Sequence, residues 1–116
     1  MLEHWFVDNC AGCGGTLPPA SGLCGVCAAE LPRVPSACGL CGLATPVAHC
    51  PRRGSAWHVA AVVAPLVYRP PVDFYLHSLK YRGRRTLGRA LALTLAHEFA
   101  AARGTGDALV AVPLHA

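Results

Sequence analysis

Seven cysteines, all lying between residues 10 and 50, constrain the fold of this 116-residue chain more than any other feature. They include three C-x-x-C pairs, and each pair begins 14 residues after the one before it. The pairs are Cys10/Cys13, Cys24/Cys27 and Cys38/Cys41. Two intervening residues let both sulfurs of one tight turn face the same ion, and the glycines beside the pairs permit such turns. The spacing therefore predicts zinc-binding knuckles, in which metal ligation replaces a packed core.

The thiols divide naturally into two zinc sites. Two knuckles make one tetrahedral site with four sulfur ligands, and the first two pairs supply Cys10, Cys13, Cys24 and Cys27. Because the protein supplies all four ligands, no coordination position is open for a substrate, and this zinc is predicted to be structural and not catalytic. The remaining cysteines, which form a second set, are Cys38, Cys41 and Cys50.

The second set lacks a fourth cysteine. A fourth knuckle would place its final cysteine at residue 53, but Arg53 cannot ligate a metal. His58, His49 or a water molecule could complete the site, or the site is weak or empty. Of the two histidines, His58 can reach the ion with less steric difficulty, because the adjacent side chains of His49 and Cys50 rarely converge on one ion. The sequence thus predicts one structural zinc and leaves the second site open.

The sequence shows neither a signal peptide nor a transmembrane segment, so we expect a cytoplasmic protein without membrane insertion. In a reducing compartment, closely paired cysteines are metal ligands more often than disulfide partners, and an odd count of seven also disfavours a closed disulfide set. The formal net charge is +4; seven thiolates and two zinc ions would change it by −7 and +4, leaving about +1. Bulk charge therefore does not predict a nucleic-acid partner.

The second half of the chain has the periodicity of regular secondary structure. A β-branched, apolar run predicts a strand near 58–64. Helical spacing of apolar residues between Pro71 and Gly83 predicts a short amphipathic helix, and these residues are Val72, Tyr75, Leu76 and Leu79. A longer helix is expected from Thr86, as its N-cap, to Gly104, as its C-cap. Its apolar stripe comprises Leu87, Leu91, Leu95, Phe99 and Ala102.

The run ALVAV, residues 108–112, predicts a buried strand that stops at Pro113. The predicted fold is a small, Cys-rich zinc-ribbon module with little regular structure, residues 1–54, followed by an incomplete α/β segment, residues 55–116. That segment has the order strand, helix, helix, strand. Because the last strand exposes unpaired edges and an apolar face, the isolated chain is expected to associate or to be poorly soluble.

An ordered combination of three motifs resembles the ComF family. The motifs are the C-x-x-C pairs, HSLKYRGRRTLGRALALTLA from His77 to Ala96, and DALVAVPLHA from Asp107 to Ala116. ComF proteins have a double zinc ribbon followed by a phosphoribosyltransferase-like domain, and the resemblance implies that this chain corresponds to their N-terminal half. It also implies a type I phosphoribosyltransferase-like α/β fold after the ribbon. The family is linked to natural competence, in which it assists the handling of incoming single-stranded DNA.

The family's pyrophosphate-sugar site has no counterpart in these residues. In the family, two adjacent acidic residues precede a Gly/Thr-rich turn whose backbone amides hold phosphate. This chain has no adjacent acidic pair, and its GTGD stretch, residues 104–107, ends a predicted helix instead of following a strand. We therefore expect no catalytic residue and no activity of the chain alone. The implied partners are single-stranded DNA, competence proteins or a separately encoded C-terminal half.

A cluster of basic residues supports an alternative from a different functional class. Five of the ten Lys and Arg residues lie between positions 80 and 89. Candidates for contact with phosphate or nucleic acid are Lys80, Arg82, Arg84 and Arg85, with Tyr81 and Tyr75 available for stacking. The simpler interpretation is a solvated basic turn between two helices. The alternative function is a freestanding zinc-ribbon module that binds single-stranded nucleic acid or a protein partner.

Overall fold

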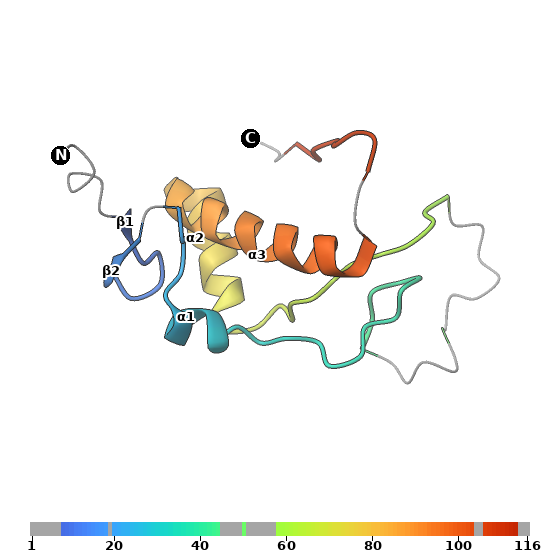
Figure 1. Ribbon diagram of the computed structural model, residues 1–116, viewed down its shortest axis with the longest axis horizontal. Helices are drawn as coiled ribbons and strands as arrows, with labels where there is room; N and C mark the ends of the chain where they lie inside the picture. The colour runs from blue at the N-terminus through green and yellow to red at the C-terminus, as the bar shows by residue number, and fades with distance from the viewer. Residues whose placement is uncertain (1–7, 19, 45–49, 51–57, 104–105, 114–116) are drawn as a thin grey trace.

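The computed structural model describes residues 8–18, 20–44, 50, 58–103 and 106–113. A two-stranded hairpin and a short helix come first, followed by a pair of longer helices (Figure 1). In chain order the elements are β1 (Asp8–Asn9), β2 (Thr16–Leu17), α1 (Gly25–Ala29), α2 (Val72–Arg82) and α3 (Arg85–Arg103). β1 and β2 pair antiparallel, so the loop between them carries the first cysteine pair.

Helix α2 has the limits that its flanking residues predict. Pro71 is its N-cap residue, and Asp73 places a negative charge in the first turn, where the helix dipole favours it. Gly83 ends the helix in the left-handed conformation, with φ 63° and its N–H donated to the carbonyl of Ser78. The predicted helix between Pro71 and Gly83 is therefore confirmed.

Helix α3 follows at once. It begins at Arg85, so Thr86 lies inside the first turn and is not the predicted N-cap. The reason is local: the N–H of Leu87 already bonds the carbonyl of Arg84 at 3.1 Å, directly after the turn at Gly83. The predicted C-cap, Gly104, lies outside the described residues.

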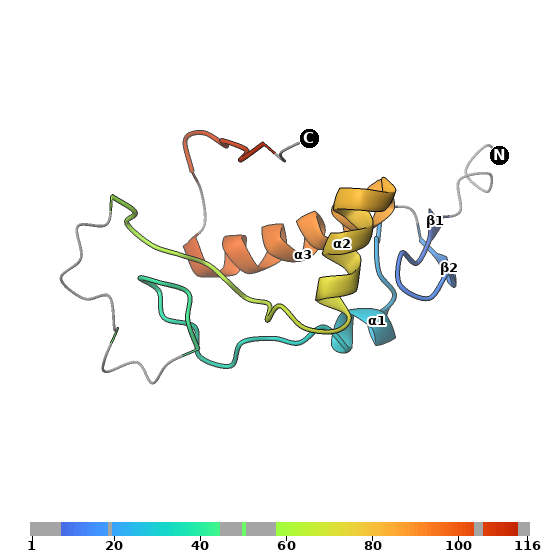
Figure 2. The ribbon, with the colours of Figure 1, turned by 180° about the vertical axis from the view of Figure 1, so that it is seen from behind.

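The core joins the cysteine-rich segment to the helical pair. Figures 1 and 2 show α1 and the hairpin beside the end of the molecule where α2 crosses the first half of α3. Leu87 is fully buried at the centre of this packing. The buried residues of the cluster are Ala11, Leu31, Val72, Tyr75, Leu87, Ala90 and Leu91. Two of them, Ala11 and Leu31, come from the cysteine-rich segment, so the first knuckle and the helices stabilise each other.

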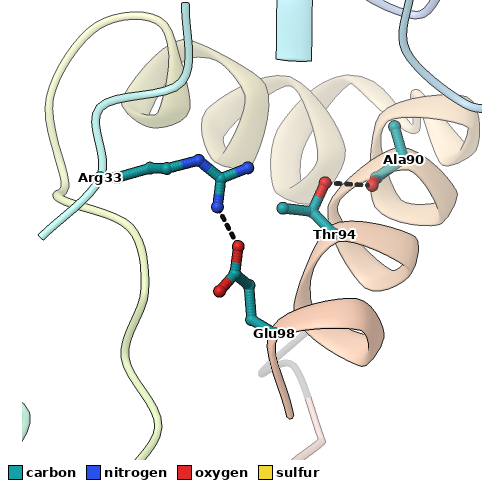
Figure 3. A network of polar contacts seen from close by, with 4 residues as sticks. All are labelled: Arg33, Ala90, Thr94 and Glu98. Carbon is teal, nitrogen blue, oxygen red and sulfur yellow. Dashed lines mark hydrogen bonds and ion pairs between the residues drawn. The ribbon is translucent and has the colours of Figure 1, made fainter. Parts of the chain in front are cut away.

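The apolar stripe of α3 is buried only over its first half. Leu87 and Leu91 are in the core, whereas Leu95 and Phe99 are 46% and 43% exposed and Ala102 is also exposed. A side-chain ion pair connects this second half to the loop after α1, because Glu98 accepts a hydrogen bond from Arg33 (Figure 3). Among the described helices, none is both long and apolar enough to cross a membrane.

The predicted strand near 58–64 is not formed. Its residues are extended, but their neighbours are the loop around the third cysteine pair and not a sheet. The N–H of Val62 donates to Gly39 at 2.8 Å, and the N–H of Val34 donates to Pro65 at 2.9 Å. Among the described residues, the pairing of this segment amounts to one isolated bridge, between Arg33 and Leu66 just after it. Prolines interrupt the pairing, since Pro65 has no N–H to donate to a ladder.

The predicted strand 108–112 is also wrong for the described chain. Residues 108–112 have no strand assignment, and Leu109, Val110 and Val112 are 99%, 88% and 90% exposed. A strand forms only where a neighbouring strand satisfies its backbone groups, and no described segment pairs with this one. The described residues therefore show a cysteine-rich module with a small helical region, without the predicted strands on either side of the helices.

Candidate metal centre

The first four cysteines converge from the two sides of the small module. Cys10 and Cys13 lie in the loop of the β1–β2 hairpin, and Cys24 and Cys27 lie at the start of α1. The four Sγ atoms all lie within 4.8 Å of one another, and those of Cys13 and Cys24 are 3.8 Å apart. A tetrahedral zinc ion with Zn–S bonds of about 2.3 Å separates its sulfurs by about 3.8 Å, whereas a disulfide would need about 2 Å. The predicted first ligand set is thus brought together at distances compatible with one bound zinc ion.

Backbone hydrogen bonds shape the first knuckle. The N–H of Cys10 donates to the carbonyl of Gly15 at 2.7 Å, and the N–H of Gly14 donates to the carbonyl of Cys10 at 2.8 Å. Gly14 has φ 78°, a conformation that side chains disfavour, and this closes the turn that presents both sulfurs. On the opposite side, Cys24 caps α1, because its sulfur accepts from the N–H of Cys27 at 3.5 Å.

The thiols of this cluster differ in their readiness to ionise. Burial raises the pKa of Cys10, but backbone donors, including the N–H of Cys24 at 3.2 Å, outweigh burial and lower it to about 6. The thiol of Cys27 has the opposite behaviour: its hydrogen bond with Cys24, followed by burial, raises its pKa to about 12. At pH 7 and without metal, Cys10 is therefore largely a thiolate, whereas Cys27 keeps its proton. An incoming cation would displace the proton of Cys27.

The third cysteine pair repeats the knuckle geometry of the first. The N–H of Cys38 donates to the carbonyl of Leu43 at 2.9 Å, and the N–H of Gly42 donates to the carbonyl of Cys38 at 2.7 Å. Cys10 and Gly14 make the same two kinds of hydrogen bond in the first knuckle. Gly42 has φ 75°, close to the value at Gly14. The first and third pairs therefore share one backbone structure, whereas the second pair of the predicted repeat lies at the start of helix α1.

The second cluster contains three cysteines. The Sγ atoms of Cys38, Cys41 and Cys50 lie within 4.8 Å of one another, and all three residues are half-buried. Amide donors at Leu40 and Cys41 lower the pKa of Cys38 to about 7. His58 is exposed and lies outside this group of sulfurs. His49 lies outside the described residues.

Both clusters are consistent with zinc sites. Thiolates are soft ligands that favour zinc, and tetrahedral sets of four sulfurs are typical of structural zinc. Comparison with protein-family models, curated proteins and solved structures finds no match to this chain. The chemistry of the centre therefore rests on its own geometry: four protein sulfurs at the first site leave no position for a substrate.

The predicted basic contacts lie together at the turn between α2 and α3. Lys80, Arg82, Arg84 and Arg85 are all exposed, and Arg84 also donates to the carbonyl of Ala11 at 3.5 Å. Tyr81 is 74% exposed beside them, as a stacking residue requires. The same prediction for Tyr75 is wrong, because its side chain is buried in the core and burial raises its pKa.

Sequence reasoning missed the role of Tyr75 at the metal centre. A Cβ atom placed on Gly12 would lie 2.7 Å from the Tyr75 hydroxyl and 2.9 Å from the sulfur of Cys27. Tyr75 thus packs directly over the first knuckle. The absence of a side chain at Gly12, between the first two cysteines, was the one local signal of this contact.

Proposed function

We propose that this chain is a ComF-like protein that acts in DNA uptake, with a structural zinc module joined to the first part of a phosphoribosyltransferase-like α/β domain. The observation that carries the proposal is the shared core. The first cysteine cluster packs against the same helices that carry the LKYRGR sequence at residues 79–84, through Ala11, Tyr75 and Leu87. The order of the cysteine pairs and the LKYRGR motif in the chain suggested the family. The first cysteine cluster and this motif thus belong to one structural unit.

The zinc in this proposal organises the fold and takes no part in a reaction. Its first site is closed by four protein sulfurs, and these 116 residues contain no adjacent acidic pair that could bind the ribose of a phosphoribosyl donor. Phosphoribosyl transfer by these residues alone is therefore not expected.

Deletion of the gene in its host tests this role. We expect transformation by added DNA to fall sharply, and to be restored by the wild-type gene but not by Cys27→Ser, which removes a buried ligand of the first cluster. Restoration by Gly25→Ala serves as the control, because a Cβ at Gly25 meets nothing within 4 Å. Unchanged transformation after deletion would refute the proposed role in DNA uptake.

Binding of single-stranded nucleic acid is a second candidate function, favoured by one specific observation. From Phe74 to His97 the chain contains no acidic residue, and the five basic residues within it are exposed. The ion pair that the described residues form, Arg33 with Glu98, lies elsewhere. Exposed cations in a stretch without acidic residues can neutralise phosphates.

Charge reversal tests this second function. Arg82→Glu should weaken binding of labelled oligothymidylate and reduce the slope of log affinity against log salt by about 0.7 for each lost phosphate contact. Arg69→Glu, the same change at an exposed arginine before α2, should have little effect. Failure of the wild-type protein to bind at low salt would exclude this function.

A further inference from the structure

Three exposed rings lie along one face of α2. Phe74, His77 and Tyr81 are separated by three and four residues, a spacing that places them on the same side of a helix. The ring centroids of His77 and Tyr81 are 4.8 Å apart, with an angle of 51° between the ring planes. At about 1.5 Å per residue, the stripe extends about 10.5 Å along the helix from Phe74 to Tyr81.

These rings are not part of the core. The buried face of α2 is formed by Val72, Tyr75 and Ser78, whereas Phe74 is 49% exposed and Tyr81 is 74% exposed. Phe74 touches the edge of the Tyr75 ring, with centroids 6.3 Å apart, so this end of the stripe is anchored to the core. Exposed rings along one face of a helix have the character of an interaction surface.

The charge around the stripe identifies the partner that fits it. Lys80 and Arg82 belong to the last turn of α2, and Arg85 begins α3 directly after the turn at Gly83. No acidic residue occurs between Phe74 and His97. A surface of flat aromatic faces beside exposed cations suits a ligand that carries both π faces and phosphates. An apolar protein partner would not require the cations.

We propose that Phe74, His77 and Tyr81 form a stacking platform for the unpaired bases of single-stranded nucleic acid, while Lys80 and Arg82 contact its phosphates. This inference rests on the nucleic-acid binding proposed above and specifies its chemistry. Single strands are preferred to duplexes because the bases of a duplex are stacked on each other and do not offer their faces to side chains.

Matched tyrosine variants of the zinc-loaded, full-length chain provide the test. Tyr81→Ala should weaken binding of labelled oligothymidylate at least about 5-fold, because each base stacked on an aromatic ring contributes this much or more. Tyr68→Ala is the control, since Tyr68 is 71% exposed and lies outside α2. Tyr81→Phe keeps the ring and should retain affinity. Far-UV circular dichroism confirms that each variant is folded.

The salt dependence separates stacking from charge. Tyr81→Ala should lower affinity without altering the salt slope, whereas Lys80→Glu and Arg82→Glu should reduce the slope. If the charge variants weaken binding but Tyr81→Ala behaves like Tyr68→Ala, the platform is refuted while the binding function stands. Equal affinity for a duplex of the same length would also refute the platform. Absence of any binding by the wild-type protein would remove both proposals.

Discussion

The hydroxyl of Tyr75 lies where a side chain at residue 12 would have to be. A Cβ on Gly12 would approach it to 2.7 Å, and would lie 2.9 Å from the sulfur of Cys27. Helix α2 is thereby packed onto the turn that holds Cys10 and Cys13. This contact makes the metal centre and the helical pair one structural unit, although more than sixty residues separate Gly12 from Tyr75 in the sequence.

Substitution of Gly12 by alanine is expected to destabilise the protein. The added methyl group would force Tyr75 or Cys27 to move, and such overpacking costs about 1–3 kcal/mol in the free energy of unfolding. Urea denaturation followed by circular dichroism measures the change. Gly25→Ala, which meets nothing within 4 Å at a helical position, should be neutral or stabilising. Equal stabilities of the two variants would contradict the contact.

Loss of a cysteine should have unequal effects at the two clusters. Cys27 is buried next to the core, so Cys27→Ser should lower the free energy of unfolding by about 4 kcal/mol or more through loss of metal. Cys38→Ser should remove metal from the second cluster with a smaller loss of helix, because Cys38 is half-buried in a loop away from the core cluster. Zinc content and circular dichroism of both variants provide the measurement. Equal loss of helix would show that the two clusters stabilise the same unit.

Zinc binding should release protons at pH 7. The pKa of Cys27 is raised to about 12, so its proton must leave when the metal binds, whereas Cys10, with a pKa of about 6, is already largely a thiolate. As the pH falls through 6, Cys10 gains a proton and competes with zinc, so apparent affinity should decline more steeply below pH 6. Calorimetry in buffers with different ionisation enthalpies counts the protons. Binding at pH 7 without proton release would be inconsistent with a protonated Cys27.

Replacement of Ser78 by alanine is expected to stabilise the protein. The hydroxyl of Ser78 is completely buried and has no hydrogen-bond partner among the described residues, so it contributes a desolvation cost without compensation. Alanine also has the higher helix propensity, and together the two effects should raise the free energy of unfolding by about 1 kcal/mol. Thermal unfolding checks this value. A lower midpoint for Ser78→Ala would reveal an unrecognised partner of the hydroxyl.

Local signals in the sequence were enough to predict the turns of the first and third cysteine pairs and the presence of helices α2 and α3, but not the short helix α1. The pairs Cys10/Cys13 and Cys38/Cys41 each close a turn within a few residues, and Pro71 and Gly83 define α2 without help from the rest of the chain. The strands predicted at 58–64 and 108–112 depend on partners far away in the sequence, and composition alone does not show whether a partner is present. The prediction that Tyr75 is available for stacking was wrong for a similar reason, because its contact with the first knuckle joins residues far apart in the sequence.

The coordination of the first cluster tests the central claim most directly. X-ray absorption at the zinc edge should be measured on a Cys38→Ser/Cys41→Ser/Cys50→Ser variant, which retains only the first set of four cysteines. We predict one zinc per chain with four sulfur neighbours at about 2.3 Å. A folded variant without zinc, or a zinc ion bound largely by nitrogen or oxygen, would contradict the assignment of Cys10, Cys13, Cys24 and Cys27 as a structural zinc site.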